Sequence, residues 1–167
     1  LLVVDAGVDG DEAVVGAAVG ARPSDPRGDL ESADALTVSD VDALLAAGRD
    51  VGRRAAQSGL VVLGEIGVGN TTVAAALACA LTGLDPAEAV GLGAGADAAI
   101  LERKRDVVAA ALLRCGPALA GSESPADQAR QALAGLGGPE IAVLTGVVLG
   151  AVEAGAPVVL DGLAGSL

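Results

Sequence analysis

Two kinds of apolar pattern alternate along the chain, namely short continuous runs and longer runs with a helical period. The continuous runs predict three buried strands, at Leu1 to Val4, Leu60 to Leu63 and Pro157 to Leu160. Helical patterns predict helices over about 39–58, 73–82, 98–113 and 139–152, with others beginning near Asp85 and Ser124. Most of 9–34 is polar and predicts a loop. This order favours one α/β domain over 1–167, a doubly wound, Rossmann-like three-layer sandwich with a mainly parallel sheet.

The composition removes several kinds of chemistry from consideration. His, Met, Phe, Tyr and Trp are absent, so histidine catalysis, common zinc sites and stacking of bases on aromatic rings lack their residues. We therefore expect no metal and no cofactor. The formal net charge of −12 argues against a nucleic-acid partner. The largest basic cluster, Arg103-Lys104-Arg105, is by itself most simply a solvated helix face.

The cysteines and the apolar runs bear on location. Cys79 and Cys115 lie in Ala/Leu-rich helical patterns, which predicts free, buried thiols rather than a disulfide. The charge-free run from Ile66 to Leu84 has glycines, Asn and Thr in its first part, so a buried helix explains it better than a membrane span. No secretory signal opens the chain, and we expect a cytoplasmic protein without a membrane partner.

Acidic residues follow each predicted strand. Asp5, Glu65 and Asp161 lie at or just past the strand ends, where ligands bind in doubly wound folds. Their convergence on one site is one interpretation. Capping of the following helices is an equally good one.

The segment Gly64-Glu-Ile-Gly-Val-Gly-Asn-Thr-Thr72 is the most informative stretch. Its glycines let backbone N–H groups approach an anion, and the helix behind it directs its positive end to the same place, which predicts a phosphate site. It is not a Walker A loop, because no Lys follows the glycines. A weak dinucleotide pattern, Gly91-x-Gly93-x-x-Ala96, lacks the required preceding strand. The plain alternative is two tight turns that pack helix on sheet.

The Gly64–Thr72 segment resembles the signature of nicotinate-nucleotide:dimethylbenzimidazole phosphoribosyltransferases, the family that makes the lower ligand of cobalamin. Further segments appear in that family's order, and they are Ala89-Val-Gly-Leu-Gly93, Lys104 with Asp106-Val-Val, Gly137-Gly-Pro-Glu-Ile141, Thr145-Gly146 and Leu160-Asp-Gly162. Val3-Val-Asp-Ala-Gly-Val8 also resembles a strand of the family, whereas 9–34 departs from it.

The resemblance implies transfer of the phosphoribosyl group from nicotinate mononucleotide to 5,6-dimethylbenzimidazole, giving α-ribazole 5′-phosphate and nicotinate. It implies that substrate contacts come from Gly67, Val68, Gly69, Asn70, Thr71, Gly93 and Lys104. Gly93 and Lys104 would help to hold the phosphate, and Glu65 would have a supporting catalytic role. It also implies a homodimer, and the apolar, alanine-rich helices favour one as well.

Two parts of the family pattern have no counterpart in the sequence. These are a C-terminal GEG segment, whose glutamate is the general base, and an N-terminal Asp-His-Gly segment. We therefore expect a fragment or a reduced form of a longer phosphoribosyltransferase. The alternatives are a non-catalytic nucleotide- or phosphate-binding domain derived from that family and, resting only on the Gly91 pattern, a dinucleotide-dependent oxidoreductase.

Overall fold

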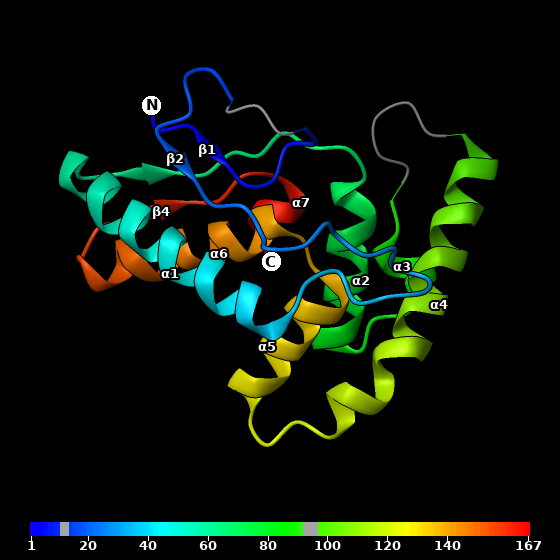
Figure 1. Ribbon diagram of the computed structural model, residues 1–167. Helices are drawn as coiled ribbons and strands as arrows, with labels where there is room; N and C mark the ends of the chain where they lie inside the picture. Colours follow the sequence, from blue (N-terminus) through cyan, green and yellow to red (C-terminus); the bar gives the residue numbers. More distant parts are fainter. Residues whose placement is uncertain (11–13, 92–96) are drawn as a thin grey trace.

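Short parallel strands joined by long helices make up the computed structural model, which describes residues 1–10, 14–91 and 97–167 (Figure 1). The strands are β1 (Val4–Asp5), β2 (Val19–Gly20), β3 (Val61–Val62) and β4 (Val158–Val159). The helices are α1 (Val38–Ala55), α2 (Asn70–Thr82), α3 (Pro86–Ala89), α4 (Ala98–Ala120), α5 (Pro125–Leu136), α6 (Pro139–Glu153) and α7 (Gly162–Gly165), and a 3-10 turn (Ala56–Ser58) follows α1. The α/β class is confirmed.

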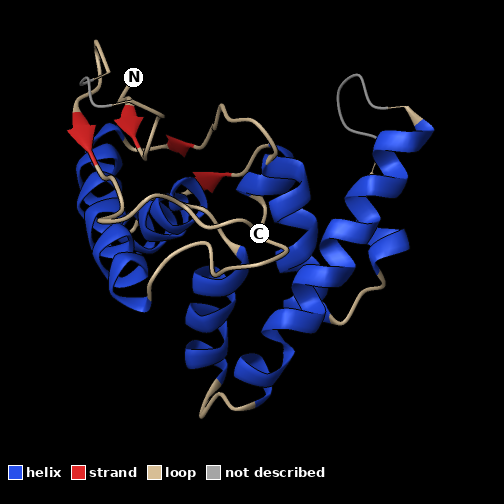
Figure 2. Cartoon of the chain, turned by 45° about the vertical axis from the view of Figure 1, so that its right-hand side comes forward, coloured by secondary structure: helices blue, strands red, loops and turns tan. Residues whose placement is uncertain are grey.

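The strands pair in two parallel ladders, β1 with β2 and β3 with β4. Strand β2 lies in the stretch for which mostly loop was expected. The prediction that all three apolar runs are buried was wrong in part. Leu1 is fully exposed, and the side chains of Val62 and Leu160 are 64% and 49% exposed. The strands lie along the upper margin of the molecule with the helices below them, so part of their surface has no cover from this chain (Figure 2).

The helix ends follow capping chemistry. Thr37 caps α1 in a reciprocal pair with Asp40, and the side chains of Asp85, Asp97 and Ser124 cap α3, α4 and α5. Two boundaries differ from the expected ones. Helix α2 begins at Asn70 rather than Val73, because Gly69 takes a left-handed conformation and serves as the N-cap. Helix α4 continues past Leu113 to Ala120 and contains Pro117, which sequence rules read as a helix breaker.

Helices α1 and α6 pack at very short range and run in the same direction, as Figure 1 also shows. A Cβ atom added to Gly48 would lie 2.9 Å from the Cα of Gly146, and one added to Gly52 would lie 2.9 Å from the nitrogen of Ala151. Gly150 meets the backbone of Arg49 in the same way. These glycines therefore allow backbone-to-backbone contact, which compensates for the absence of large core side chains.

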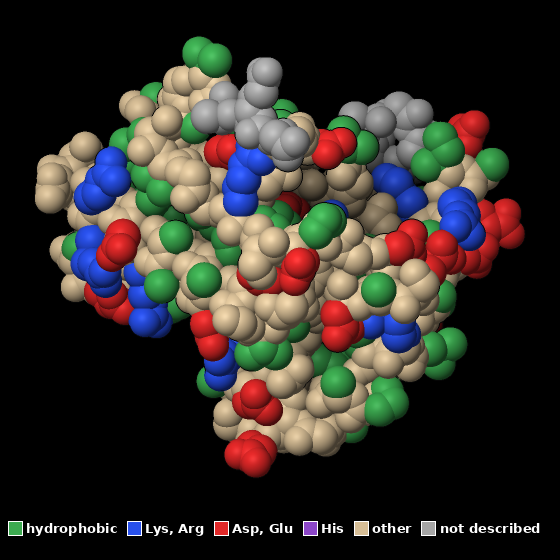
Figure 3. Space-filling view, in the orientation of Figure 1, with side chains coloured by type: hydrophobic (Ala, Val, Ile, Leu, Met, Phe, Trp, Pro, Cys, Tyr) green, Lys and Arg blue, Asp and Glu red, His purple; other side chains and the backbone are tan. Residues whose placement is uncertain are grey.

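The core consists of Ala, Val, Leu and Ile with both cysteines. Cys79 and Cys115 are free and buried as predicted, and burial raises the pKa of both thiols. Among the described residues, no helix is both long enough and apolar enough to cross a membrane. Lys and Arg side chains are interleaved with Asp and Glu across the face shown in Figure 3 rather than gathered into one basic patch.

Buried Asp40 makes stability depend on acid pH. The hydroxyl of Thr37 donates to its carboxylate, and with the N–H and hydroxyl of Ser24 it lowers the pKa of Asp40 to about 2. The unfolded chain releases this proton nearer pH 4. Asp40 thus stabilises the fold above about pH 4, and this contribution is lost as the pH falls toward 2. Urea unfolding at several pH values should show the loss, and it should be smaller in Asp40→Asn than in the exposed control Asp25→Asn.

Candidate functional site

The loop between β3 and α2 brings a helix N-terminus to the carboxyl edge of a strand. Gly69 has a φ of +85° and caps α2 without any side-chain hydrogen bond. This conformation favours glycine, and it leaves the first turn of the helix open to an outside group. The positive end of the helix dipole therefore faces an accessible surface, which suits a phosphate.

The side chain of Asn70 contacts two other residues of this loop, Glu65 and Gly67. The side-chain amide of Asn70, which is 6% exposed, donates to the carboxylate of Glu65. A Cβ atom on Gly67 would lie 2.6 Å from Oδ1 of Asn70, so the amide occupies the space that a side chain would need. The Asn70 amide thus orients the Glu65 carboxylate, and the glycine makes that arrangement possible.

Lys104 reaches the start of α2 from a different helix. Its Nζ donates to Oγ1 of Thr71 over 3.2 Å, although 33 positions separate the two residues. The two neighbouring arginines bind other groups. Arg103 donates to the carboxylate of Glu31 at 2.7 Å, and Arg105 donates to the carbonyl of Ala87 at 3.4 Å. The basic triplet is therefore not a uniform solvated face, since each cation has its own partner.

The remaining predicted contacts are less defined. The side chain of Val68 is fully exposed, so nothing in this chain covers it. Gly93 and the weak dinucleotide pattern around it lie outside the described residues. Seven of the eight predicted residues thus lie in one neighbourhood, from which the side chain of Val68 projects, and the eighth is Gly93.

A hollow of about 360 Å³ opens beside this neighbourhood. Its lining comes from three parts of the chain, and these are the 27–31 segment, the first turn of α2 at Gly69 and Thr72, and α4 at Arg103 and Val107. Sequence reasoning missed the 27–31 segment because a polar loop carries no periodic signal. The Glu31–Arg103 ion pair and the hydrogen bonds of Arg114 to Leu30 and Asp34 hold the segment against α4.

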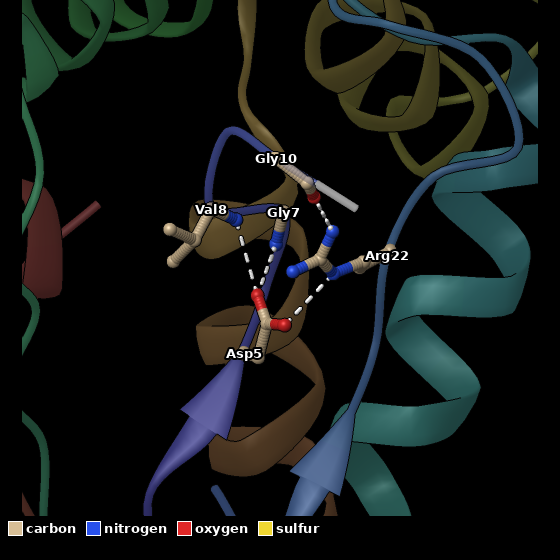
Figure 4. Close-up of polar contacts among 5 residues, drawn as sticks. All are labelled: Asp5, Gly7, Val8, Gly10 and Arg22. Atoms are coloured by element: carbon tan, nitrogen blue, oxygen red, sulfur yellow. Dashed lines mark hydrogen bonds and ion pairs between the residues drawn. The ribbon is translucent and has the colours of Figure 1, made fainter. Parts of the chain in front are cut away.

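The carboxylate of Asp5 accepts hydrogen bonds from the turn that follows β1 and from Arg22 (Figure 4). One carboxylate oxygen accepts from the N–H groups of Gly7 and Val8, each at 3.0 Å, and the other accepts from Nε of Arg22 at 2.7 Å. The Val8 N–H is the largest of the effects that lower the pKa of Asp5. Arg22 also donates to the carbonyl of Gly10, so the pair anchors the loop after β1.

The three acidic strand ends differ in environment. Asp5 is buried against Arg22, Glu65 is bound to Asn70 and partly buried, and Asp161 is exposed at the start of α7. Their carboxylates are therefore not equivalent, and Asp5 fits the structural interpretation better than the binding one. Within the described ranges no group of acidic and cysteine side chains is arranged to hold a metal ion.

Comparison with known proteins supplies the family context. A family model described as phosphoribosyltransferase matches residues 1–166. A nicotinate-nucleotide–dimethylbenzimidazole phosphoribosyltransferase from Thermus thermophilus is 42% identical over 135 residues, and one from Chromobacterium violaceum is 39% identical over 169 residues. These matches cover 80% and 99% of this chain but only 38% and 46% of the relatives. A crystal structure of CobT from Thermus thermophilus superposes with a TM-score of 0.83 at 37% identity, covering 99% of this chain and 49% of that one.

Proposed function

This chain belongs to the phosphoribosyltransferase family, and we propose that it is an α/β domain of an enzyme that transfers phosphoribosyl from nicotinate mononucleotide to 5,6-dimethylbenzimidazole. The products would be α-ribazole 5′-phosphate and nicotinate, in cobalamin biosynthesis. One observation carries the proposal, namely that Lys104 lies against Thr71 at the open N-terminus of α2. The chain spans less than half the length of the relatives named above.

The start of α2 has the properties that a phosphate anchor requires. The helix dipole and the backbone N–H groups at Gly69 and Asn70 attract the 5′-phosphate, and Lys104 adds a compact positive charge. Thr71 holds the Lys104 amine at this end of the helix before substrate arrives. Anchoring the phosphate fixes the ribose, so that the attacking nitrogen and the leaving pyridinium meet the anomeric carbon from opposite faces.

Glu65 supplies negative charge where the reaction develops positive charge. As nicotinate departs, the ribose ring becomes cationic, and a carboxylate held in advance stabilises that state more than it stabilises the substrate. The hydrogen bond from Asn70 keeps the Glu65 side chain in place. This is a supporting role, because removing a proton from the benzimidazole product is a separate task.

We further propose that the enzyme is a cytoplasmic protein and a homodimer, and the uncovered apolar surface supports the homodimer. Leu60, Val62, Ile66 and Val68 are all more than half exposed. Surfaces of this kind usually mark contacts with other protein. Analytical ultracentrifugation of this chain, and of any longer protein that contains it, would test the homodimer. A monomer at micromolar concentration would contradict the homodimer.

The phosphate anchor is tested by titrating this chain with nicotinate mononucleotide in a calorimeter. Lys104→Ala should weaken binding by about ten- to a hundredfold, because a hydrogen bond to a charged group contributes about 1.5–3 kcal/mol. Arg54→Ala removes an exposed positive charge elsewhere and should leave the affinity unchanged. Equal losses in both variants would mean that only net charge matters. Binding that is unaffected by Lys104→Ala would remove this lysine from the anchor.

A further inference from the structure

Glu140 carries a buried acceptor that has no donor. Its Oε1 atom is inaccessible to solvent and has no hydrogen-bond partner among the residues that the structure describes. The carboxylate lies over Gly138, and a Cβ atom added there would be 2.6 Å from Oε2. A buried carboxylate oxygen without a donor is costly, so such groups call for a functional explanation.

Chain topology places Glu140 at the same edge of the molecule as the proposed phosphate anchor. Glu140 is in the first turn of α6, and α6 leads through a short turn into β4. Helix α6 therefore runs opposite to β4 and begins at the carboxyl edge of the strands. Because β3 is parallel to β4, the start of α2 lies at that edge too.

Two contacts support this placement. Helix α7, which follows β4 directly, packs against both α2 and α6. In addition, Pro139 lies beside the turn after β1, since a Cβ atom on Gly7 would be 3.5 Å from its Cγ. The beginning of α6 thus lies beside the segment that follows β1, and α6 also contacts the segment that follows β4.

We propose that Glu140 is a substrate-binding residue, and that its partly exposed side chain turns on binding so that Oε1 accepts a hydrogen bond from a ribose hydroxyl of the nucleotide. The inference rests on the proposed function, which brings a phosphoribosyl group to this edge. A ribose offers hydroxyl donors and no charge, which matches an oxygen that lacks a donor. In dinucleotide-binding doubly wound folds an Asp or Glu hydrogen-bonds a ribose hydroxyl, so a carboxylate is a suitable partner for this group.

A purely structural role for Glu140 makes different demands. A first-turn glutamate that only complements the helix dipole needs no buried, unpartnered oxygen, and its removal should lower stability. If Oε1 is a ligand-binding acceptor, it has no partner in the free chain. Removing the carboxylate should then leave the free energy of unfolding unchanged or increase that free energy. Stability and affinity therefore move differently under the two interpretations.

The test compares nicotinate mononucleotide with its 2′-deoxy and 3′-deoxy analogues by calorimetry. The unaltered chain should lose about tenfold in affinity for one of the analogues, which identifies the hydroxyl. Glu140→Ala should bind nicotinate mononucleotide about tenfold more weakly and no longer distinguish it from that analogue. Gly138→Ala keeps the carboxylate but displaces it, so it should show the same loss. Glu88→Ala, at another first-turn glutamate, is the control.

The outcomes separate this inference from the proposed function. If Lys104→Ala weakens binding while Glu140→Ala has the affinity and selectivity of the unaltered chain, Glu140 does not touch the ribose and the proposed function stands. An affinity loss in Glu140→Ala that leaves the preference over the deoxy analogues intact also overturns the inference, because the effect is then indirect. If the unaltered chain does not bind nicotinate mononucleotide, both proposals fail for this chain.

Discussion

Replacing Gly146 by alanine is expected to lower the free energy of unfolding by about 3 kcal/mol, the upper part of the usual range for overpacking. The added methyl group would lie 2.9 Å from the Cα of Gly48 and 3.0 Å from the nitrogen of Arg49. Both are backbone atoms, which cannot rotate away as a side chain would. Helix α1 must therefore separate from α6, and the main helix-to-helix contact of the fold weakens.

Urea unfolding followed by circular dichroism measures this effect. The matched control is Gly116→Ala in α4, where an added Cβ atom has no neighbour within 4 Å. Alanine is the better helix former, but Pro117 disfavours a side chain on the preceding helical residue, so this control should change the free energy of unfolding by less than about 1 kcal/mol. A large loss in Gly146→Ala beside a small change in Gly116→Ala is the expected result. A neutral Gly146→Ala would mean that the two helices are not packed backbone to backbone.

Gly67→Ala is expected to weaken the binding of nicotinate mononucleotide by about thirtyfold and to lower the free energy of unfolding as well. A methyl group at Gly67 takes the space of the Asn70 amide, which is buried and has little room to move. The amide must turn away from Glu65, which loses its hydrogen bond, and the first turn of α2 shifts with it. A displaced amide and a displaced helix end together cost about 2 kcal/mol, which corresponds to this factor.

Calorimetric titration of Gly67→Ala beside Gly64→Ala provides the comparison. Gly64 lies in the same loop, but an added Cβ atom there would meet nothing within 4 Å. The Gly64 variant should therefore bind normally. If both variants lose affinity equally, general stiffening of the loop is responsible and the Asn70 contact is not.

The sequence was most informative where local chemistry decides structure. Helix starts near Asp85, Ala98 and Ser124 were predicted and are confirmed, and the structure shows the reason, because the side chains of Asp85, Asp97 and Ser124 cap the backbone N–H groups nearby. Errors occurred at Asn70, where a glycine replaced the usual cap, and at Pro117, which lies inside a helix. In both places the helix boundary departs from what the residue type alone indicates.

The candidate site was predictable only in part. Residues 64–72 carry a contiguous signature, so their proximity followed from the chain itself. The meeting of Lys104 with Thr71 depends on how α4 packs against α2. The 27–31 segment had no sequence signal. Glu140 belongs to the Gly137–Ile141 segment of the resemblance, but its unpartnered oxygen could not be predicted, because an ion pair or a missing partner is a property of distant neighbours.

Burial of the strands shows the same division. Continuous apolar runs determined where extended chain would form, since backbone conformation depends on neighbouring residues. They did not determine that Val62 and Leu160 would be exposed, because burial depends on which other surface lies on top of a strand. The amino-acid sequence alone therefore determined the order of strands and helices, the caps and the glycine loop. Only the tertiary structure decided the α1–α6 contact, the position of Lys104 and the lack of a hydrogen-bond donor for Oε1 of Glu140 among the described residues. Each of these depends on atoms far apart in the chain.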